Sequence, residues 1–235
     1  PHDAHASPPR PIRGSGLVSV ATRARHAVLL SSQRPEIMSH GVETTEELAP
    51  LLERASVIAI GPGLGQSEWG RALYAATMAT DKPLVVDADA LNLLAAAPQP
   101  RGNWILTPHP GEAARLLGVK PADIEVDRFQ AARELQKRYK GIIVLKGAGS
   151  LVIGENERIH VCADGNPGMA SGGMGDVLTG IIAGLRAQRY DALQSAQLGV
   201  CLHAAAGDAA AENGERGLLA SDLMPWIQRL ANPTP

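Results

Sequence analysis

Short apolar runs alternate with helical patterns along most of the chain. Continuous apolar residues at 57–60, 84–86, 104–106 and 142–145 predict four buried strands, and the run from Leu17 to Thr22 predicts another. Residues with helical spacing lie between these runs. Apolar strands that alternate with helices are typical of a parallel sheet that carries helices on both faces. The pattern therefore predicts the α/β class.

Local signals mark several of the element boundaries. Thr44 and Glu47 have the spacing of a capping box, and Ser67 can cap the helix that follows it. An exposed amphipathic helix is expected at 127–139, and a hairpin is expected across 151–161. Three helices are expected to close the chain, from Gly175 to Gln188, from Ala192 to Glu212 and from Ser221 to Leu230.

Glycine and polar residues gather where the predicted strands end. The segments 61–65, 87–92 and 107–112 each follow a strand directly, and Lys146 ends another. Ligands of open α/β sheets bind outside the carboxyl ends of the strands. We therefore expect these segments, together with the glycine-rich stretch 166–176, to face one crevice.

The bulk composition limits the class of protein. The 235 residues suit one large domain, and the net charge of −2 argues against a nucleic-acid partner or an anionic membrane surface. The two cysteines form neither a disulfide framework nor a metal-binding spacing, so a reducing cytoplasm is the expected location. The apolar runs are far shorter than the roughly 20 residues that span a bilayer, so no membrane association is expected.

The first residues differ from the rest of the chain. Residues 1–16 hold prolines, histidines and arginines without any periodic pattern. We expect a disordered or non-native leader there, an ordered domain over 17–235, and a chain that is a fragment of a longer product.

The stretch from Asn166 to Asp176 is the most informative part of the chain. Glycines and small residues fill it, Asp176 ends it, and an apolar run with helical spacing follows. Backbone amides at a helix N-terminus bind anions, and glycines let that backbone approach a phosphate closely. The stretch therefore indicates a phosphate held by backbone amides beside a carboxylate, although an ordinary glycine-rich loop remains the alternative.

The turn at 61–65 is a less specific indication of function than the stretch 166–176. A dinucleotide-binding fingerprint would require a third glycine at position 66, where the chain has Gln66. The turn either brings backbone close to a ligand or serves packing alone.

Single polar residues at the strand ends leave alternatives open. Asp87 and Asp89 could orient a hydrated magnesium ion or a ligand hydroxyl, but Asp89 could equally cap the next helix. His109 could hydrogen-bond a substrate, and Glu112 could either do the same or be a first-turn acid favoured by the helix dipole.

Two further polar residues, Lys146 and His203, also have more than one possible role. Lys146 could meet a nucleotide phosphate as a point charge, or its side chain could extend to solvent. His203 lies within an Ala-rich helix, and we expect it to be a core residue with its hydrogen bonds satisfied rather than a ligand.

Taken together, these segments resemble a known family. The order Gly-Pro-Gly-Leu-Gly, Asp-Ala-Asp-Ala-Leu-Asn, Thr-Pro-His-Pro-Gly-Glu, Lys-Gly and Gly-Gly-Met-Gly-Asp is similar to that of the ADP-dependent NAD(P)H-hydrate dehydratases. These form the carbohydrate-kinase-like half of bifunctional NAD(P)H-hydrate repair enzymes. The likeness runs from about Gly16 to about Leu230, whereas the last motif alone would indicate only the wider ribokinase-like superfamily.

The resemblance implies a ribokinase-like fold with a mostly parallel central sheet. It also implies that the S-epimer of NADH hydrate or NADPH hydrate is dehydrated at the expense of ADP, which yields AMP, phosphate and the restored cofactor. ADP is then a cosubstrate, and Mg²⁺ is the expected metal. A homo-oligomer, with a tetramer as the expected form, is usual for such enzymes.

The resemblance also assigns residues to roles. Asp176 would be the catalytic base and would contact the hydrate, together with Gly63, His109, Pro110, Gly111, Glu112, Ala113, Ala114 and Arg115. The nucleotide would be held by Lys146, Gly147, Ala148, Gly149, Ser150, Asn166, Pro167, Gly168, Met169, Ala170, Ser171, Gly172, Gly173, Met174 and Gly175.

The chain departs from the family at its start, and other functions compete. A strand, a glycine-rich turn and a helix usually precede the segment that matches Leu17, so we expect reduced stability or weak activity for this chain alone. The competing functions are a ribokinase-like small-molecule kinase and a non-catalytic nucleotide-binding remnant.

Overall fold

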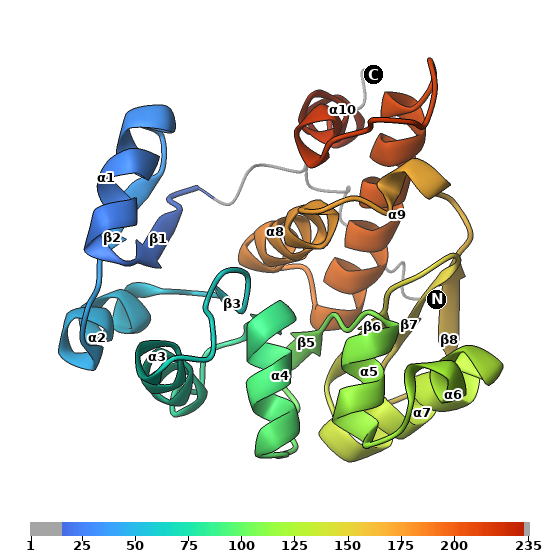
Figure 1. Cartoon of the computed structure of the whole chain (residues 1–235), viewed down its shortest axis with the longest axis horizontal. Coiled ribbons are helices and arrows are strands. Elements are labelled where there is room, and N and C mark those ends of the chain that lie inside the picture. The colour runs from blue at the N-terminus through green and yellow to red at the C-terminus, as the bar shows by residue number, and fades with distance from the viewer. Residues whose placement is uncertain (1–15, 233–235) are drawn as a thin grey trace, which may run out of the picture.

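The computed structural model describes residues 16–232 as one sheet with helices on both faces and a smaller two-stranded sheet beside it (Figure 1). The expected leader over 1–16 lies outside the described residues except for Gly16. The strands are β1 (Ser19–Thr22), β2 (Met38–Gly41), β3 (Ile58–Ile60), β4 (Leu84–Val86), β5 (Trp104–Leu106), β6 (Ile142–Leu145), β7 (Ser150–Ile153) and β8 (Ile159–Cys162).

Ten α-helices connect and follow these strands within the described part of the chain. They are α1 (Ala24–Gln33), α2 (Thr45–Arg54), α3 (Glu68–Met78), α4 (Ala88–Ala96), α5 (Pro110–Leu117), α6 (Pro121–Val126), α7 (Arg128–Tyr139), α8 (Met174–Ala187), α9 (Ala192–Ala210) and α10 (Leu223–Leu230). Short 3₁₀ turns occupy Pro167–Met169 and Ala220–Asp222.

The main sheet has the order β3-β4-β5-β6-β7-β8. The first four strands run parallel, and the β6-β7-β8 part is antiparallel. Val86 pairs with Ile60 on one side and with Leu106 on the other, so β3, β4 and β5 end level with one another. The chain after each parallel strand therefore emerges at the same edge of the sheet, as the sequence pattern predicted.

Two apolar layers hold the helices to this sheet. Successive strand residues point to opposite faces, so Leu84 and Val86 join the layer beneath α3 to α7, whereas Val85 joins the layer beneath α8 and α9. The fully buried Trp104 and Tyr139 fill the first layer, and the Trp104 indole Nε1 donates to the Tyr139 carbonyl at 3.1 Å. The α/β class with a mostly parallel sheet is confirmed.

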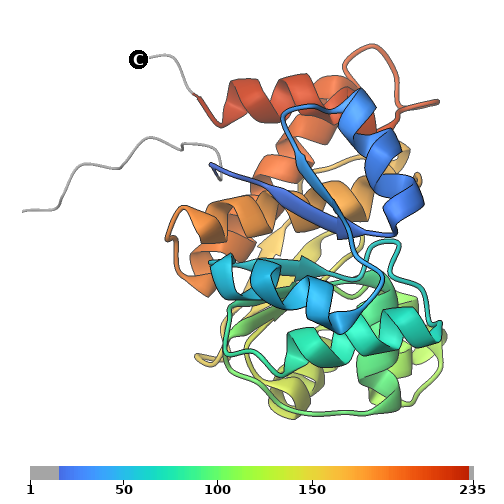
Figure 2. The same ribbon diagram turned by 90° about the vertical axis from the view of Figure 1, so that its left-hand side faces the viewer.

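The β1 and β2 strands form a separate parallel pair next to α1 (Figures 1 and 2). Within residues 16–232, β1 pairs with β2 and not with the main sheet. This region joins the rest through an apolar cluster that buries Val42, Leu48 and Leu73. Its outer side leaves Val28 and Leu29 largely exposed.

Local signals succeeded at most boundaries and failed in the early part of the chain. The capping box of Thr44 and Glu47 is present, and the Ser67 side chain accepts from the Gly70 amide at 3.4 Å. The pattern did not predict α1, β2 or α6. The Arg23 side chain makes no capping bond to α1, and α1 has one buried residue, Ala27, so neither a cap nor an apolar stripe marks that helix in the sequence.

The turn after β3 provides a test of the fold. Gly61 has φ +134°, and a Cβ there would lie 1.7 Å from the Asp87 carbonyl oxygen. Gly61→Ala should therefore lower the free energy of unfolding by about 3 kcal/mol or more, because backbone strain adds to a clash with rigid backbone. Chemical denaturation of the purified variant measures this loss.

Gly118→Ala is the matched control, because Gly118 also has positive φ, +75°, but a Cβ there meets no atom within 4 Å. Strain alone should cost this variant roughly 1–2 kcal/mol. Equal losses at the two positions would contradict the close approach of Gly61 to Asp87.

Candidate functional site

A cavity of about 760 Å³ opens at the edge of the sheet where the parallel strands end. Its walls come from the ends of β4, β5 and β6, from the loop after β8, and from the first turns of α8 and the middle of α9. The volume lies within the range of small-molecule sites. Four of the five segments expected to face one crevice thus meet there, whereas the turn at 61–65 contributes no residue to the cavity.

The N-terminus of α8 forms one wall of this cavity. Gly173 occupies the position before the helix with φ +86°, a conformation that favours glycine. Within the described chain, the backbone amides of Met174, Gly175 and Asp176 donate to no other protein group. These free donors and the positive end of the helix dipole make the turn suitable for an anion.

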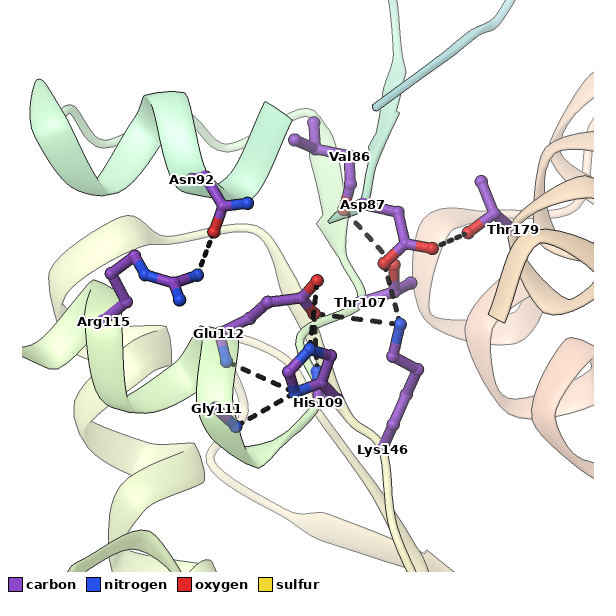
Figure 3. Close-up of polar contacts among 10 residues, drawn as sticks. All are labelled: Val86, Asp87, Asn92, Thr107, His109, Gly111, Glu112, Arg115, Lys146 and Thr179. Atoms are coloured by element: carbon purple, nitrogen blue, oxygen red, sulfur yellow. Dashed lines mark hydrogen bonds and ion pairs between the residues drawn. The ribbon is translucent and has the colours of Figure 1, made fainter. Parts of the chain in front are cut away.

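Lys146 places a positive charge against the same turn. A Cβ on Gly175 would lie only 3.1 Å from the Lys146 Nζ atom, so the ammonium group packs closely against this turn. The Lys146 Nζ atom lies 2.8 Å from Asp87 Oδ1 and 3.9 Å from Glu112 Oε2 (Figure 3). The lysine side chain is 18% exposed, so it does not extend into solvent and faces the cavity instead.

His109 and Glu112 form a capping box at the start of α5. The His109 Nδ1 atom accepts from the amides of Gly111 and Glu112 at 3.0 and 3.4 Å, and Glu112 Oε2 accepts from the His109 amide at 2.8 Å. Because Nδ1 is an acceptor, the neutral imidazole carries its hydrogen on Nε2. That Nε2 atom lies 3.4 Å from Glu112 Oε1. His109 lines the cavity as well, so it combines a structural role with access to a ligand.

Asp176 lies in the first turn of α8 and lines the cavity. Burial and the negative charge of Asp87 raise the pKa of Asp176, while the Lys146 ammonium group opposes this shift. The carboxylate is therefore a better proton acceptor than an ordinary aspartate.

Side chains from outside the cavity hold the two loops that follow β6 and β8. Arg128, in the first turn of α7, donates to the carbonyls of Leu145, Lys146 and Ala148. Asp208 of α9 accepts from the Gly165 amide at 2.9 Å and from the Asn166 side chain at 3.0 Å. The loops after β6 and β8 thus have fixed positions without any ligand contact.

Most of the site residues expected from the sequence line this cavity. They are His109, Pro110, Glu112, Lys146, Gly147, Ala148, Gly149, Ser150, Asn166, Pro167, Met169, Ala170, Ser171, Met174, Gly175 and Asp176. The others do not line it, namely Gly63, Gly111, Ala113, Ala114, Arg115, Gly168, Gly172 and Gly173. Ala113 and Ala114 are buried in the core, and the Arg115 guanidinium donates to the Asn92 side chain.

The cavity also contains residues that the sequence did not single out as ligands. Cys162, Leu178, Val200 and Ala204 form an apolar wall. These residues have ordinary core patterns, and only the knowledge that β8, α8 and α9 meet would have placed them at the site.

The expectation that the hydrogen bonds of His203 are satisfied is wrong. In the described structure its buried Nε2 atom has no hydrogen-bond partner, and the residue lines the cavity. Burial lowers the pKa of His203 to about 4, so the ring is neutral at physiological pH.

The alternative capping role of Asp89 is also wrong. The residue before α4 is Asp87, and Asp89 lies inside the first turn. Its Oδ2 atom accepts from the Gly65 amide at 2.8 Å and so ties the turn after β3 to α4. Within residues 16–232, no three His, Cys, Asp or Glu side chains gather to hold a metal ion, and no described helix has the length and apolarity needed to cross a membrane.

Known proteins resemble the chain over most of its length. The carbohydrate-kinase family model described as NAD(P)H-hydrate dehydratase matches residues 12–229. The chain is 54% identical over 221 residues to a bifunctional NAD(P)H-hydrate repair enzyme of Coxiella burnetii, which covers 94% of this chain and 45% of that protein. It is 41% identical to the ADP-dependent (S)-NAD(P)H-hydrate dehydratase of Neisseria meningitidis, over 84% of this chain and 69% of that protein.

Solved structures agree with the sequence relatives. The Bacillus subtilis ADP/ATP-dependent NAD(P)H-hydrate dehydratase, co-crystallised with ATP and Mg²⁺ and soaked with CoA, superposes with a TM-score of 0.78 at 28% identity. That likeness covers 92% of this chain and 80% of the other. A ribokinase-like superfamily protein of Enterococcus faecalis superposes with a TM-score of 0.79 at 29% identity, over 91% and 76% of the two chains. The expected ribokinase-like fold is confirmed.

The double role of His109 leads to a prediction about stability. His109→Ala removes the side-chain acceptor at the start of α5 and should lower the free energy of unfolding by about 1 kcal/mol. His109→Asn supplies another good N-cap and should stay within a few tenths of a kcal/mol of the original chain. Thermal and urea unfolding measure both variants. If the alanine variant were as stable as the asparagine variant, His109 would not cap the helix.

Proposed function

The chain belongs to the NAD(P)H-hydrate dehydratase family, and we propose that it uses ADP to dehydrate the S-epimer of NADH hydrate or NADPH hydrate. The products are AMP, phosphate and the restored NADH or NADPH. The chain spans about half the length of the first bifunctional relatives that it matches, so we propose the dehydratase activity alone.

One geometric observation carries the proposal. Asp176 lies in the same cavity as the free amides of α8 and the ammonium group of Lys146, which sits against Gly175. A terminal phosphoryl group at this turn would be next to a carboxylate with a raised pKa. The arrangement supports transfer of a phosphoryl group to an alcohol.

The first step activates the hydroxyl group of the hydrated nicotinamide ring. Asp176 accepts the hydroxyl proton while the oxygen forms a bond to the terminal phosphorus of ADP. The bond from that phosphorus to the bridging oxygen breaks, and AMP leaves with the electron pair. A positioned general base contributes roughly 10²–10⁴-fold to such a step, and each backbone donor to the transferring group is worth about 3 kcal/mol.

The second step removes the phosphate group that the first step has attached. The lone pair of the ring nitrogen expels the phosphate, which leaves with the electrons of the carbon–oxygen bond. Loss of a proton from the neighbouring ring carbon then restores the double bond of the reduced nicotinamide. The products balance the loss of one water from the hydrate and the hydrolysis of ADP.

We propose the following division of the cavity. The loops 146–150 and 166–175 hold the adenine nucleotide, and the α5 start at His109 faces the hydrate. Five further residues remain predicted contacts of the hydrate although they do not line the described cavity, namely Gly63, Gly111, Ala113, Ala114 and Arg115. Mg²⁺ is commonly held by phosphates and water with few protein ligands, so it would arrive with the nucleotide and neutralise phosphate charge there.

Two broader properties also belong to this proposal. We propose a cytoplasmic location and a homo-oligomer, with a tetramer as the expected form. Light scattering of the purified chain tests the oligomeric state directly.

The role of Asp176 predicts a clean separation of turnover from binding. Asp176→Asn should reduce kcat at least about 100-fold, because the proton acceptor is lost. ADP binding should be kept or tightened, since the change removes one negative charge near the phosphates. The assay follows the absorbance of the reduced nicotinamide ring and free phosphate, starting from (S)-NADH hydrate and ADP, with reactions lacking ADP as the control.

The same assay separates the competing functions. A small-molecule kinase that acts on another alcohol would restore no reduced nicotinamide from the hydrate, and a non-catalytic remnant would bind ADP without turnover. Near-normal turnover of Asp176→Asn would remove the base role from this residue.

The raised pKa of Asp176 predicts the shape of the pH profile. The base must be deprotonated, so kcat should fall as the pH decreases through the pKa of Asp176. Because burial and Asp87 raise that pKa, the fall should begin at a higher pH than an exposed aspartate would give. Measurement of kcat between about pH 4 and 8 tests this. A profile that stays flat down to the ordinary aspartate pKa would contradict it.

A further inference from the structure

Asp87 occupies the N-cap position of α4 but does not cap that helix. An aspartate at this position usually accepts a hydrogen bond from an amide in the first helical turn. Here Oδ2 accepts from the Thr179 hydroxyl at 2.8 Å, and Oδ1 pairs with the Lys146 ammonium at 2.8 Å (Figure 3). The Asp87 side chain is 2% exposed. It bonds to two residues distant in the sequence and to no amide of its own helix.

We propose that Asp87 and Thr179 are positioning residues that hold the ammonium group of Lys146 against the N-terminus of α8, where a nucleotide phosphate binds. Thr179 orients the Asp87 carboxylate, and Asp87 orients Lys146. Neither Asp87 nor Thr179 needs to touch the substrate. The proposal takes ADP as the ligand from the proposed function, but its first test measures binding and requires no turnover.

The backbone around Asp87 is fixed on both sides. The Asp87 amide donates to the Ile60 carbonyl at 3.0 Å, and its own carbonyl packs so closely on Gly61 that no Cβ fits there. Ala88 has φ +46°, a left-handed conformation that is unfavourable for a residue other than glycine. Such strain persists only where the surrounding structure imposes it, so the Asp87 carboxylate has a rigid base.

Lys146 has a competing partner on the other side of the cavity. The Glu112 Oε2 atom, on α5, lies 3.9 Å from Nζ, and Glu112 is also buried. Without the Asp87 charge, the ammonium group would be drawn toward Glu112 and away from Gly175. Asp87 thus decides which wall of the cavity carries the positive charge.

Asp87→Asn distinguishes positioning from a simple charge effect. Asparagine has nearly the same shape and removes one negative charge close to the phosphate site. If Asp87 only repelled the ligand, the variant would bind ADP more tightly. If Asp87 positions Lys146, the variant should bind ADP roughly 10- to 100-fold more weakly, as the loss of a charged hydrogen bond predicts. Calorimetric titration with ADP measures the difference.

A Lys146→Met background completes the test. In that background there is no ammonium group to position, so adding Asp87→Asn should leave ADP binding unchanged or tighten it. An equal weakening in both backgrounds, or tighter binding of ADP by Asp87→Asn alone, would overturn the proposal.

Substitution of Thr179 provides a second test that leaves the charges of the site unchanged. Thr179→Val keeps every charge and nearly the same volume but removes the donor to Asp87, so it should weaken ADP binding about 3- to 10-fold. Thr179→Ser keeps the hydroxyl and should restore the original affinity. Thr77→Val is the matched control, because the buried Thr77 hydroxyl donates at 2.9 Å to the Leu73 carbonyl within α3, away from the cavity. If Thr77→Val and Thr179→Val weakened ADP binding equally, the effect would be structural.

A pH profile of turnover provides a readout that a merely structural role would not move. Asp176 faces Asp87 after β4 and Lys146 after β6, with Glu112 of α5 and the neutral His203 of α9 on the same cavity. Burial and the Asp87 charge together raise the pKa of Asp176, and Asp87→Asn removes the second cause, so the acid limb should move to lower pH. Thr179→Val keeps that charge and should leave the limb in place. If the original chain bound ADP but lacked turnover, the proposed function would fail while the binding test still decided the role of Asp87.

Discussion

The ion pair between Lys146 and Asp87 joins the parts of the molecule that form the cavity. Its two members end β6 and β4, which have β5 between them in the sheet, and the pair packs against the first turn of α8. A buried ion pair rarely stabilises a fold more than a well-packed apolar pair would, because both charges lose their hydration. Its presence at the carboxyl edge of the sheet is therefore better explained by the ligand that it meets than by stability.

The charges around this pair are not balanced by protein alone. Asp87, Glu112, Asp164 and Asp176 contribute four carboxyl groups to the cavity, whereas Lys146 is the cation among its lining residues. An anionic phosphate would meet net repulsion there unless backbone dipoles and a nucleotide-bound cation contribute. Burial raises the pKa of Asp176, and the negative charge of Asp87 adds to this shift. The Asp87 charge, which opposes phosphate binding, thus also helps to make Asp176 an effective base.

The sequence predicted the strands that build the cavity because their signals are local. The β4, β5 and β6 strands are continuous apolar runs, each followed directly by polar residues, and parallel strands bring their ends to one edge. The glycines before α8 signalled an anion site by their conformational freedom. These signals need no knowledge of tertiary contacts.

Other parts of the site depend on contacts that no local pattern records. Asp87 looked like a residue for a metal ion or a ligand hydroxyl group, and only the approach of α8 shows that Thr179 and Lys146 occupy its oxygens. His203 looked like an ordinary core residue, but packing leaves its Nε2 atom unpartnered beside the cavity. The α1 and β2 elements escaped prediction for a related reason, since exposed apolar residues such as Val28 obscure the amphipathic pattern.

Under the proposed function, the chemistry of the substrate, and not the residues around the phosphate, determines whether the phosphorylated intermediate loses its phosphate. The amides of α8, Lys146 and Asp176 would serve any transfer of a phosphoryl group to an alcohol. In the hydrate, however, the new phosphate ester stands next to a ring nitrogen whose lone pair can expel it. A kinase-like site therefore becomes a dehydratase when its alcohol carries such a nitrogen. Selectivity then rests on the residues that admit the nicotinamide ring, and the α5 start, where His109 is held by its own capping bonds, is the rigid wall available for that task.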